Sequence, residues 1–351
     1  MFDIIITTRN SKKKIIKCLE YVLSAKSFKK KNWVNKIILS DYSNDNTKVL
    51  FKKFCRENQI KNFIIENTKP GKSPALISAL SLVQKPFVVL IDDDNLIKEN
   101  FFYNLNNLLK HHLKKNQIRR VGIIGSQGLP LTNIKNKKIT ENILNFPNMF
   151  ALGNQYNFPS IIQRVKFNNS YKKYGVWGAC SIISKNFINS FFQQNMNLVL
   201  NPKGQFSDMG EDTELSLIAH FLNYNIYFSN SLMFYHDLEF SRLEKDKFIN
   251  KKLKFAVKSD VVLKYYTYLL FKKKKIITLK RFFFSNIKLL IIYESIKYLA
   301  LFLRLKINKI NKKNILTLRQ EKIKLNELIK KRNSDDMILS LKQVKQQLQN
   351  I

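Results

Sequence analysis

The first 130 residues alternate short apolar runs with amphipathic segments. Four apolar runs, rich in β-branched residues, predict buried strands at residues 2–8, 36–39, 62–66 and 87–91. Between them, apolar residues at helical spacing predict helices at 11–26, 48–57 and 75–83, with polar turns at 40–47 and 69–74. Strands that alternate with helices indicate βαβ units, so we expect an α/β fold with a doubly wound, mostly parallel sheet flanked by helices.

Three carboxylates follow the fourth apolar run directly, within the segment FVVLIDDDNLI at residues 87–97. Ligands of α/β sheets bind where strands end, so Asp92, Asp93 and Asp94 occupy a favourable position for a site. Buried carboxylates need a cation or hydrogen-bond donors, and hard oxygen ligands suit Mg²⁺ or Mn²⁺ bridged to phosphate. The alternative is a solvated acidic turn.

The composition suits a large folded domain with a basic extension. The chain has 351 residues, of which 45% are hydrophobic, and 62 Lys and Arg against 25 acids give a net charge of +37. This charge indicates an anionic partner, such as nucleic acid, anionic lipid or nucleotide, although a biased genome composition explains it equally well. Three cysteines without CxxC spacing predict neither a zinc site nor disulfides and fit a reducing cytoplasm. Asp3 makes the first residues unlike a signal peptide.

A change of composition near residue 250 predicts two domains, residues 1–250 and a basic helical C-terminal region at 251–351. Charged residues interrupt the longer apolar stretch of that region, 282–303, so we do not expect it to span a membrane. Its lysine clusters favour helices that bind an anionic membrane surface, and a helical cap on the larger domain is the alternative. Partial heptad character at 315–350 suggests a homo-oligomer through these helices, and a frayed polar helix is the alternative.

Six segments in order carry a resemblance to a known family: IIITTRN, LSDYSNDNT, KPGKSPAL, LIDDDN, WGAC and GEDTELS. Together they resemble the family-two glycosyltransferases of GT-A fold over roughly residues 1–240. The resemblance implies a nucleotide-sugar half at about 1–125, an acceptor half at about 126–250, and sugar transfer from a nucleotide diphosphate with inversion. Ser40 and Tyr42 depart from the family's Asp-Asp-Gly, and Pro74 crowds the glycine turn.

The resemblance implies that the donor is held by seven residues, namely Thr8, Arg9, Asp41, Gly71, Lys72, Asp92 and Asp93. Asp41 would accept an N–H of the base, and the alternative is an Asx turn within residues 41–44. Arg9 would stack on the base or offset diphosphate charge, unless it is a surface arginine without a role. Gly71 and Lys72 would bring backbone N–H groups and a cation to the donor, or form an ordinary turn before a helix.

The same resemblance assigns a metal and a catalytic base. Asp92 and Asp94 become an Asp-x-Asp pair for Mn²⁺ or Mg²⁺, and His236 either completes this site or faces solvent. Asp212 becomes the general base that takes the proton of the acceptor hydroxyl, with Glu211 positioning it. The alternative for these two acids is favourable placement at a helix N-terminus.

On the acceptor side, Trp177, Gly178 and Ala179 are implied to contact the sugar, with a core tryptophan as the alternative. We therefore expect a nucleotide-sugar donor, a glycan or lipid-linked acceptor, and a cytoplasmic protein at the inner face of the membrane. A nucleic-acid-binding protein would interleave aromatic and basic residues on one surface, whereas the acids here cluster at strand ends. A Mg²⁺-dependent nucleotidyltransferase would need a glycine-rich loop after the first strand, and residues 7–10 contain no glycine.

Overall fold

The computed structural model describes residues 1–67, 71–130, 163–164, 176, 179–198, 211–236 and 346. The chain divides into two compact units, Met1–Ser259 with Asn350–Ile351 and Asp260–Gln349, and all described residues other than Gln346 belong to the first. The basic region 251–351, with its expected membrane and oligomer contacts, thus lies outside the described residues, again apart from Gln346. Within the described part of the chain, no helix has the length and hydropathy needed to cross a bilayer.

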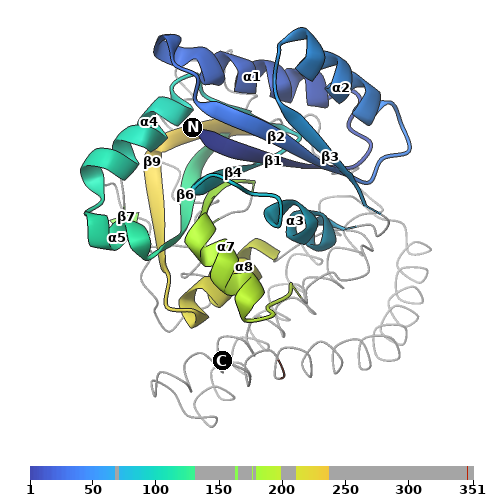
Figure 1. Cartoon of the computed structure of the whole chain (residues 1–351). Helices are drawn as coiled ribbons and strands as arrows, with labels where there is room; N and C mark the ends of the chain where they lie inside the picture. Colours follow the sequence, from blue (N-terminus) through green and yellow to red (C-terminus); the bar gives the residue numbers. More distant parts are fainter. Residues whose placement is uncertain are drawn as a thin grey trace, which may run out of the picture. The chain divides into compact units, whose positions relative to one another are not determined.

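The described strands form one sheet in the order β3-β2-β1-β4-β8-β6-β9-β5, with β7 paired to β9 (Figure 1). Four parallel strands make up its first half: β1 (Phe2–Thr8), β2 (Val34–Asp41), β3 (Asn62–Glu66) and β4 (Phe87–Asp92). The second half is mixed and contains β5 (Asn95–Ile97), β6 (Val121–Pro130), β7 (Gln163–Arg164), β8 (Cys180–Ser184) and β9 (Asn225–His236). There β8 runs antiparallel to both β4 and β6, whereas β9 is parallel to β6 and antiparallel to β5 and β7.

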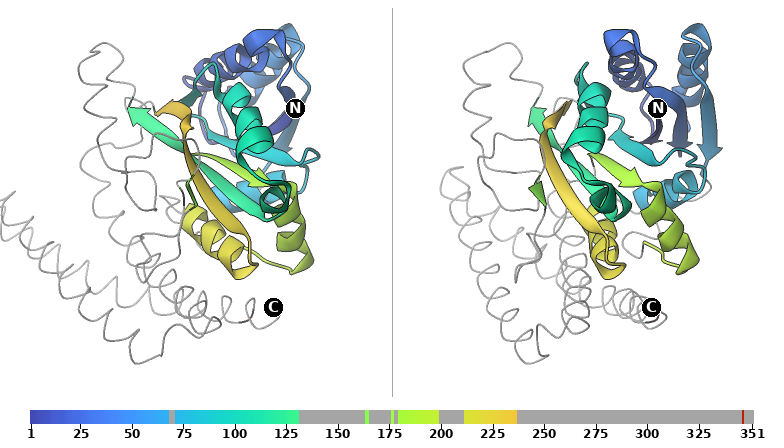
Figure 2. Two further views of the ribbon diagram at one scale, coloured as in Figure 1. Left: turned by 90° about the vertical axis from the view of Figure 1, so that its left-hand side faces the viewer. Right: turned by 60° about the vertical axis from the view of Figure 1, so that its left-hand side comes forward.

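Helices cover both faces of the sheet, which confirms the predicted fold class (Figures 1 and 2). One face carries α1 (Ile15–Ser27), α2 (Thr47–Glu57) and α4 (Phe101–Asn107), and the other carries α3 (Lys72–Leu80), α7 (Lys185–Gln193) and α8 (Glu211–Phe221). Three short helical segments complete the described helices: η1 (Phe28–Lys30), η2 (Leu108–His112) and α5 (Lys115–Arg119).

The continuous apolar run of β1 reflects burial on both of its faces. Ile4 and Ile6 belong to the same hydrophobic cluster as Ile15 and Leu19 of α1, whereas Ile5 points to the opposite face. Each fully buried isoleucine contributes about 1.5–3 kcal/mol relative to an exposed one. A strand covered by helices on both sides therefore loses the alternating pattern that a half-exposed strand would show.

Several predicted boundaries were wrong: the first helix begins at Ile15 and not at residue 11, and two further differences lie next to the candidate site. Ser40 and Asp41 were expected in a turn, but they continue β2 and pair with Thr7 and Thr8 of β1. Parallel neighbours on both sides supply backbone partners to the end of β2, and these outweigh the turn preference of the two side chains.

Helix α3 begins at Lys72, earlier than the predicted residue 75. Pro74 is its third residue, where the missing N–H has no intrahelical partner to lose, so the proline does not delay the helix. Gly71 precedes the helix with φ 130°, a value that residues with a Cβ rarely adopt. Of the predicted turn at 69–74, Gly71 is therefore the described residue that directly precedes the helix.

The buried carboxylate of Asp3, near the N-terminal end of β1, holds neighbouring segments together by hydrogen bonds. Asp3 accepts hydrogen bonds from Asn35 Nδ2 at 2.7 Å and from the backbone N–H groups of Gln84 and Lys85 at 2.6 and 3.0 Å. Lys36 is also buried, and its ammonium donates to the carbonyl of Leu82 at 2.8 Å. Burial lowers the pKa of Lys36, and the charge of Asp3 opposes that shift.

We predict that Asp3→Ala lowers the free energy of unfolding by about 3–5 kcal/mol, because it leaves the N–H donors of Asn35, Gln84 and Lys85 without their acceptor. Asp3→Asn keeps the shape and one acceptor oxygen, so its loss should be smaller. Urea denaturation followed by circular dichroism measures both. An Asp3→Ala protein as stable as the wild type would contradict this role.

Candidate active site

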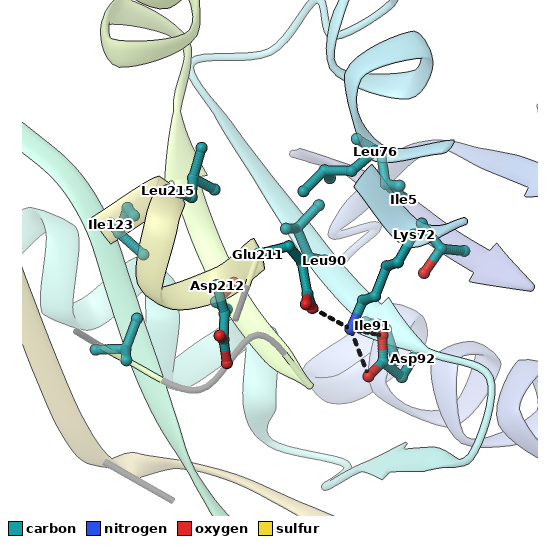
Figure 3. A pocket seen from close by; sticks show the side chains of 13 residues that line it. Ile5, Lys72, Leu76, Leu90, Ile91, Asp92, Ile123, Glu211, Asp212 and Leu215 are labelled. Atoms are coloured by element: carbon teal, nitrogen blue, oxygen red, sulfur yellow. Dashed lines mark hydrogen bonds and ion pairs between the residues drawn. The ribbon is translucent and has the colours of Figure 1, made fainter. Parts of the chain in front are cut away.

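A cavity of about 410 Å³, part of which is open to solvent, lies beside the C-terminal ends of β1 and β4 (Figure 3). Its apolar wall includes Ile5, Leu76, Leu90, Ile123 and Leu215. Its polar residues are Thr7, Lys72, Asp92, Ser181, Glu211 and Asp212. The cavity therefore joins the end of the acidic strand to the first turns of α3 and α8.

Lys72 links two carboxylates across this cavity (Figure 3). Its Nζ lies 2.8 and 2.9 Å from the two carboxylate oxygens of Asp92 and 3.2 Å from Oε1 of Glu211. Burial acts to lower the pKa of Lys72, but the charges of Asp92 and Glu211 outweigh it and hold the pKa well above its usual value. Lys72 is therefore a permanent cation between β4 and α8.

The three consecutive aspartates point to different partners. Asp92 faces Lys72, whereas the buried Asp93 accepts hydrogen bonds from Thr8 Oγ1 at 2.8 Å and from the Ser11 hydroxyl. Lys14 Nζ stands 3.9 Å from Asp93 Oδ1 and 3.7 Å from Asp94 Oδ2. One side of the triplet thus contacts α3, and the other contacts the start of α1.

The crowded carboxylates retain part of their repulsion. Burial raises the pKa of Asp92 to about 6, with Asp94 adding to the shift and Lys72 opposing it. Burial also raises the pKa of Asp94 to about 6, with Asp93 adding to the shift and Lys14 opposing it. Both groups remain mostly ionised at pH 7, so this cluster attracts a further cation.

His236, at the end of β9, lies on the far side of Asp94. Its Nδ1 is 2.9 Å from Asn95 Oδ1 and 3.6 Å from Asp94 Oδ1. Asn95 is buried, and its Nδ2 donates to the carbonyl of Ala179 at 2.7 Å, which leaves its Oδ1 as the acceptor toward the imidazole. Nδ1 of His236 is then the protonated nitrogen, and any metal ligation would use Nε2.

Asp94 and His236 supply two ligand types that suit Mn²⁺, a carboxylate oxygen and an imidazole, but the imidazole would have to turn to present Nε2, because Nδ1 is the nitrogen that lies near Asp94. The third expected ligand, Asp92, is turned toward Lys72 instead. In the described ranges, no three His, Cys, Asp or Glu side chains form a complete set of ligands. A cation held here would take its remaining ligands from phosphate oxygens and water, as is common for Mg²⁺ sites.

The residues expected at the nucleotide lie around the ends of β1 and β2. Asp41 is buried, which raises its pKa, and it accepts from the hydroxyl of Ser43 at 2.5 Å and the backbone N–H of Ser43 at 3.3 Å. The Asx turn weighed as the alternative is therefore present, and a contact with the base stays a prediction. Arg9 places its guanidinium 5.7 Å from the ring centre of Tyr42, which is 37% exposed.

The expected acceptor residues are only partly described, because Trp177 and Gly178 lie outside the described residues. Ala179 is buried, and its carbonyl accepts from the backbone N–H of Asp92 at 2.9 Å as well as from Asn95. Its observed contacts support the acidic strand, and its predicted contact with a sugar stays a prediction.

Glu211 and Asp212 begin α8, as predicted, and both line the cavity. The apolar face of the helix, with Leu217 and Ile218 fully buried, packs under the sheet and fixes the direction of this first turn. The catalytic roles of the two acids stay predictions, but their position beside Lys72 is compatible with them.

Sequence reasoning missed Ser11 and Lys14, which both contact the acidic triplet. Lys14 belongs to the run Lys12-Lys13-Lys14, which looks like a solvated basic turn. One signal was present: Lys14 precedes the buried Cys18 and Val22 at intervals of four residues, so it shares the inward face of the helix.

We predict that Asp94→Asn stabilises the protein at pH 7 by about 1–2 kcal/mol when chelator removes metal ions. The folded-state pKa of about 6 exceeds the ordinary value, so the folded carboxyl holds its proton where the unfolded one has lost it. Its destabilising effect grows as the pH rises from about 4 to 6 and is fully present at pH 7. Thermal unfolding should show the gain at pH 7 and none at pH 4; a pH-independent difference would contradict the assignment.

The family model described as "Glycosyl transferase family 2" matches residues 3–190, more than half of the chain. No curated protein matches.

Solved structures match at low identity. TarS 1–349 of S. aureus, in complex with UDP-GlcNAc, has a TM-score of 0.50 and 16% identity, covering 75% of this chain and 66% of that chain. The chain spans 42% of a longer TarS structure. The mannosyltransferase PcManGT from Pyrobaculum calidifontis, in complex with GDP-Man and Mn²⁺, has a TM-score of 0.48 and 14% identity over 99% of this chain and 86% of that chain. The TarS 1–349 complex supports the fold, and the match of the family model shows that the chain belongs to glycosyl transferase family 2.

Proposed function

We propose that this protein is an inverting glycosyltransferase that moves a sugar from a nucleotide diphosphate donor to a hydroxyl of a glycan or lipid-linked acceptor, with Mn²⁺ or Mg²⁺ as cofactor. The observation that carries the proposal is the position of Lys72, which joins Asp92 on the acidic strand to Glu211, the neighbour of Asp212. Family membership favours sugar transfer over nucleotidyl transfer or nucleic-acid binding.

The donor side of the cavity is suited to a diphosphate. Lys72 keeps its positive charge and stands where Asp92 ends β4, so its ammonium would exchange part of its contact with carboxylates for phosphate oxygens. The ends of β1 and β2, with Arg9, Asp41 and the exposed Tyr42, would take the nucleoside. The UDP-GlcNAc bound to TarS supports a nucleotide sugar as the donor class.

The transfer needs one base and one way to neutralise the leaving group. An acceptor hydroxyl would attack the anomeric carbon from the face opposite the diphosphate, and a new C–O bond would form as the bond to the phosphate oxygen breaks. Asp212 would take the hydroxyl proton, and the charge of Lys72 would stabilise the departing nucleoside diphosphate. A divalent cation at Asp94 and His236 would supply further neutralisation of that charge when bound.

The proposal of a lipid-linked acceptor is based on the net positive charge of the chain and on its basic C-terminal region, residues 251–351. A net charge of +37, with clusters at Lys272–Lys275 and Lys280–Arg281, favours attachment to an anionic membrane surface, where lipid-linked acceptors lie. Each such cation contributes about 1 kcal/mol near the leaflet.

We predict that Asp212→Asn lowers kcat by about 100-fold or more, the usual loss when a general base is removed. Donor affinity should change little, because the base serves the acceptor. Glu57→Gln, on the surface of α2, is the control and should leave both quantities unchanged. If donor affinity falls as far as kcat, Asp212 belongs to the donor site and its role as base is wrong.

We predict that Asp94→Ala abolishes the Mn²⁺-dependent part of donor affinity while the protein stays folded. The change removes one of the two side chains that fit a cation, together with a source of repulsion. Calorimetric titration of a nucleotide-sugar panel, with Mn²⁺ and with chelator, measures the effect. Glu99→Ala, an exposed acid just beyond β5, should retain it; an Asp94→Ala protein that also retains it would remove Asp94 from the metal site.

A further inference from the structure

Lys14 occupies a position that helix formation does not explain. It is the N-cap residue of α1, its side chain makes no capping hydrogen bond, and the first turn of the helix contains no acid. A cation is disfavoured at a helix N-terminus, where the macrodipole is positive, and burying an ammonium adds a desolvation cost. The side chain of Lys14 is nevertheless only 12% exposed.

The acidic triplet provides the compensating interaction. The ammonium of Lys14 lies within 4 Å of oxygens from both Asp93 and Asp94. Asp93 is already held by the hydroxyls of Thr8 and Ser11, so its geometry is fixed without the lysine. Asp94 is different, because no hydroxyl among the described residues is seen to hold it, and it lies 3.7 Å from the ammonium of Lys14 and 3.6 Å from the imidazole of His236. The lysine therefore approaches the carboxylate that best fits a metal.

We propose that Lys14 is a built-in counter-cation that competes with the divalent cation for Asp94, so that the cation binds tightly only together with the diphosphate. This inference rests on the proposed use of a metal. A divalent ion at Asp94 meets repulsion from Lys14 and Lys72, which both stand beside the triplet. A diphosphate brings the negative charge that offsets this repulsion, so metal and nucleotide each raise the affinity for the other.

This competition means that the metal ion binds tightly only after, or together with, the nucleotide. Free metal ion alone would find the carboxylates already partly neutralised by two ammonium groups, and Asp92 engaged with Lys72. With the nucleotide present, phosphate oxygens would supply the missing ligands and draw Lys72 toward themselves. Lys14 then acts as a specificity-determining residue, because it disfavours a metal ion without its nucleotide.

Lys14→Met tests this, because methionine keeps most of the side-chain volume and removes the charge. The matched control is Lys13→Met, which removes an exposed charge from the adjacent position. Titration of each protein with MnCl₂ alone, followed by the electron paramagnetic resonance of free Mn²⁺, gives the metal affinity. The titration is repeated with saturating UDP and with saturating GDP, and thermal unfolding in chelator reports on the metal-free state.

We expect Lys14→Met to bind Mn²⁺ alone about tenfold more tightly than the wild type, and to show a correspondingly smaller gain from nucleotide. Its melting temperature in chelator should fall and should recover with Mn²⁺. Lys13→Met should behave as the wild type. If Lys14→Met does not fold, Lys14→Gln carries the same expectation.

Two results would overturn the role of Lys14. One leaves the proposed function unchanged, and the other also removes the metal ion from it. Equal or weaker Mn²⁺ affinity in Lys14→Met, with normal metal binding by the wild type, would reject the competition and leave the proposed function standing. Absence of Mn²⁺ binding by both proteins, with and without nucleotide, would remove the metal from the proposed function and the competition with it.

Discussion

Repulsion among Asp92, Asp93 and Asp94 is the interaction around which the described site is organised. The three carboxylates point in different directions and bring partners from several elements to the end of β4. Thr8 comes from β1, Ser11 and Lys14 from the segment that leads into α1, Lys72 from α3 and His236 from β9. The triplet thus connects both faces of the sheet at one point, and changing any of its partners alters the charge balance of the others.

The position of β4 in the sheet explains why this point is also a suitable place for chemistry. β4 is parallel to β1 on one side and antiparallel to β8 on the other, so it joins the parallel half to the mixed half. A nucleotide can reach the carboxyl ends of the parallel strands, and the other half brings α8 and the end of β9 to the same place. Lys72 approaches the triplet from the parallel half and His236 from the mixed half. Neither cancels the whole negative charge of the three aspartates, so part of that charge remains available to a ligand.

Much of the N-terminal half could be predicted from the sequence, because its strands and helices follow one another and carry strong local patterns. The acidic strand, the start of α8 and the glycine before Lys72 were recognisable in the same way. The mixed half was not, since the order of β8, β6, β9 and β5 depends on pairings between residues far apart in the chain. For the same reason the contact of Lys14 with Asp94 escaped notice: one lysine in a run of three gains its role only from a strand about eighty residues away.

A crystal structure with a nucleoside diphosphate and Mn²⁺ would test the central claim most directly, namely that the acidic end of β4 and Lys72 together hold the diphosphate of a donor. The account predicts diphosphate density in contact with Lys72 Nζ, and an anomalous manganese peak beside Asp94 and His236. A diphosphate bound away from the end of β4, with Lys72 still joined to Asp92 and Glu211, would contradict it.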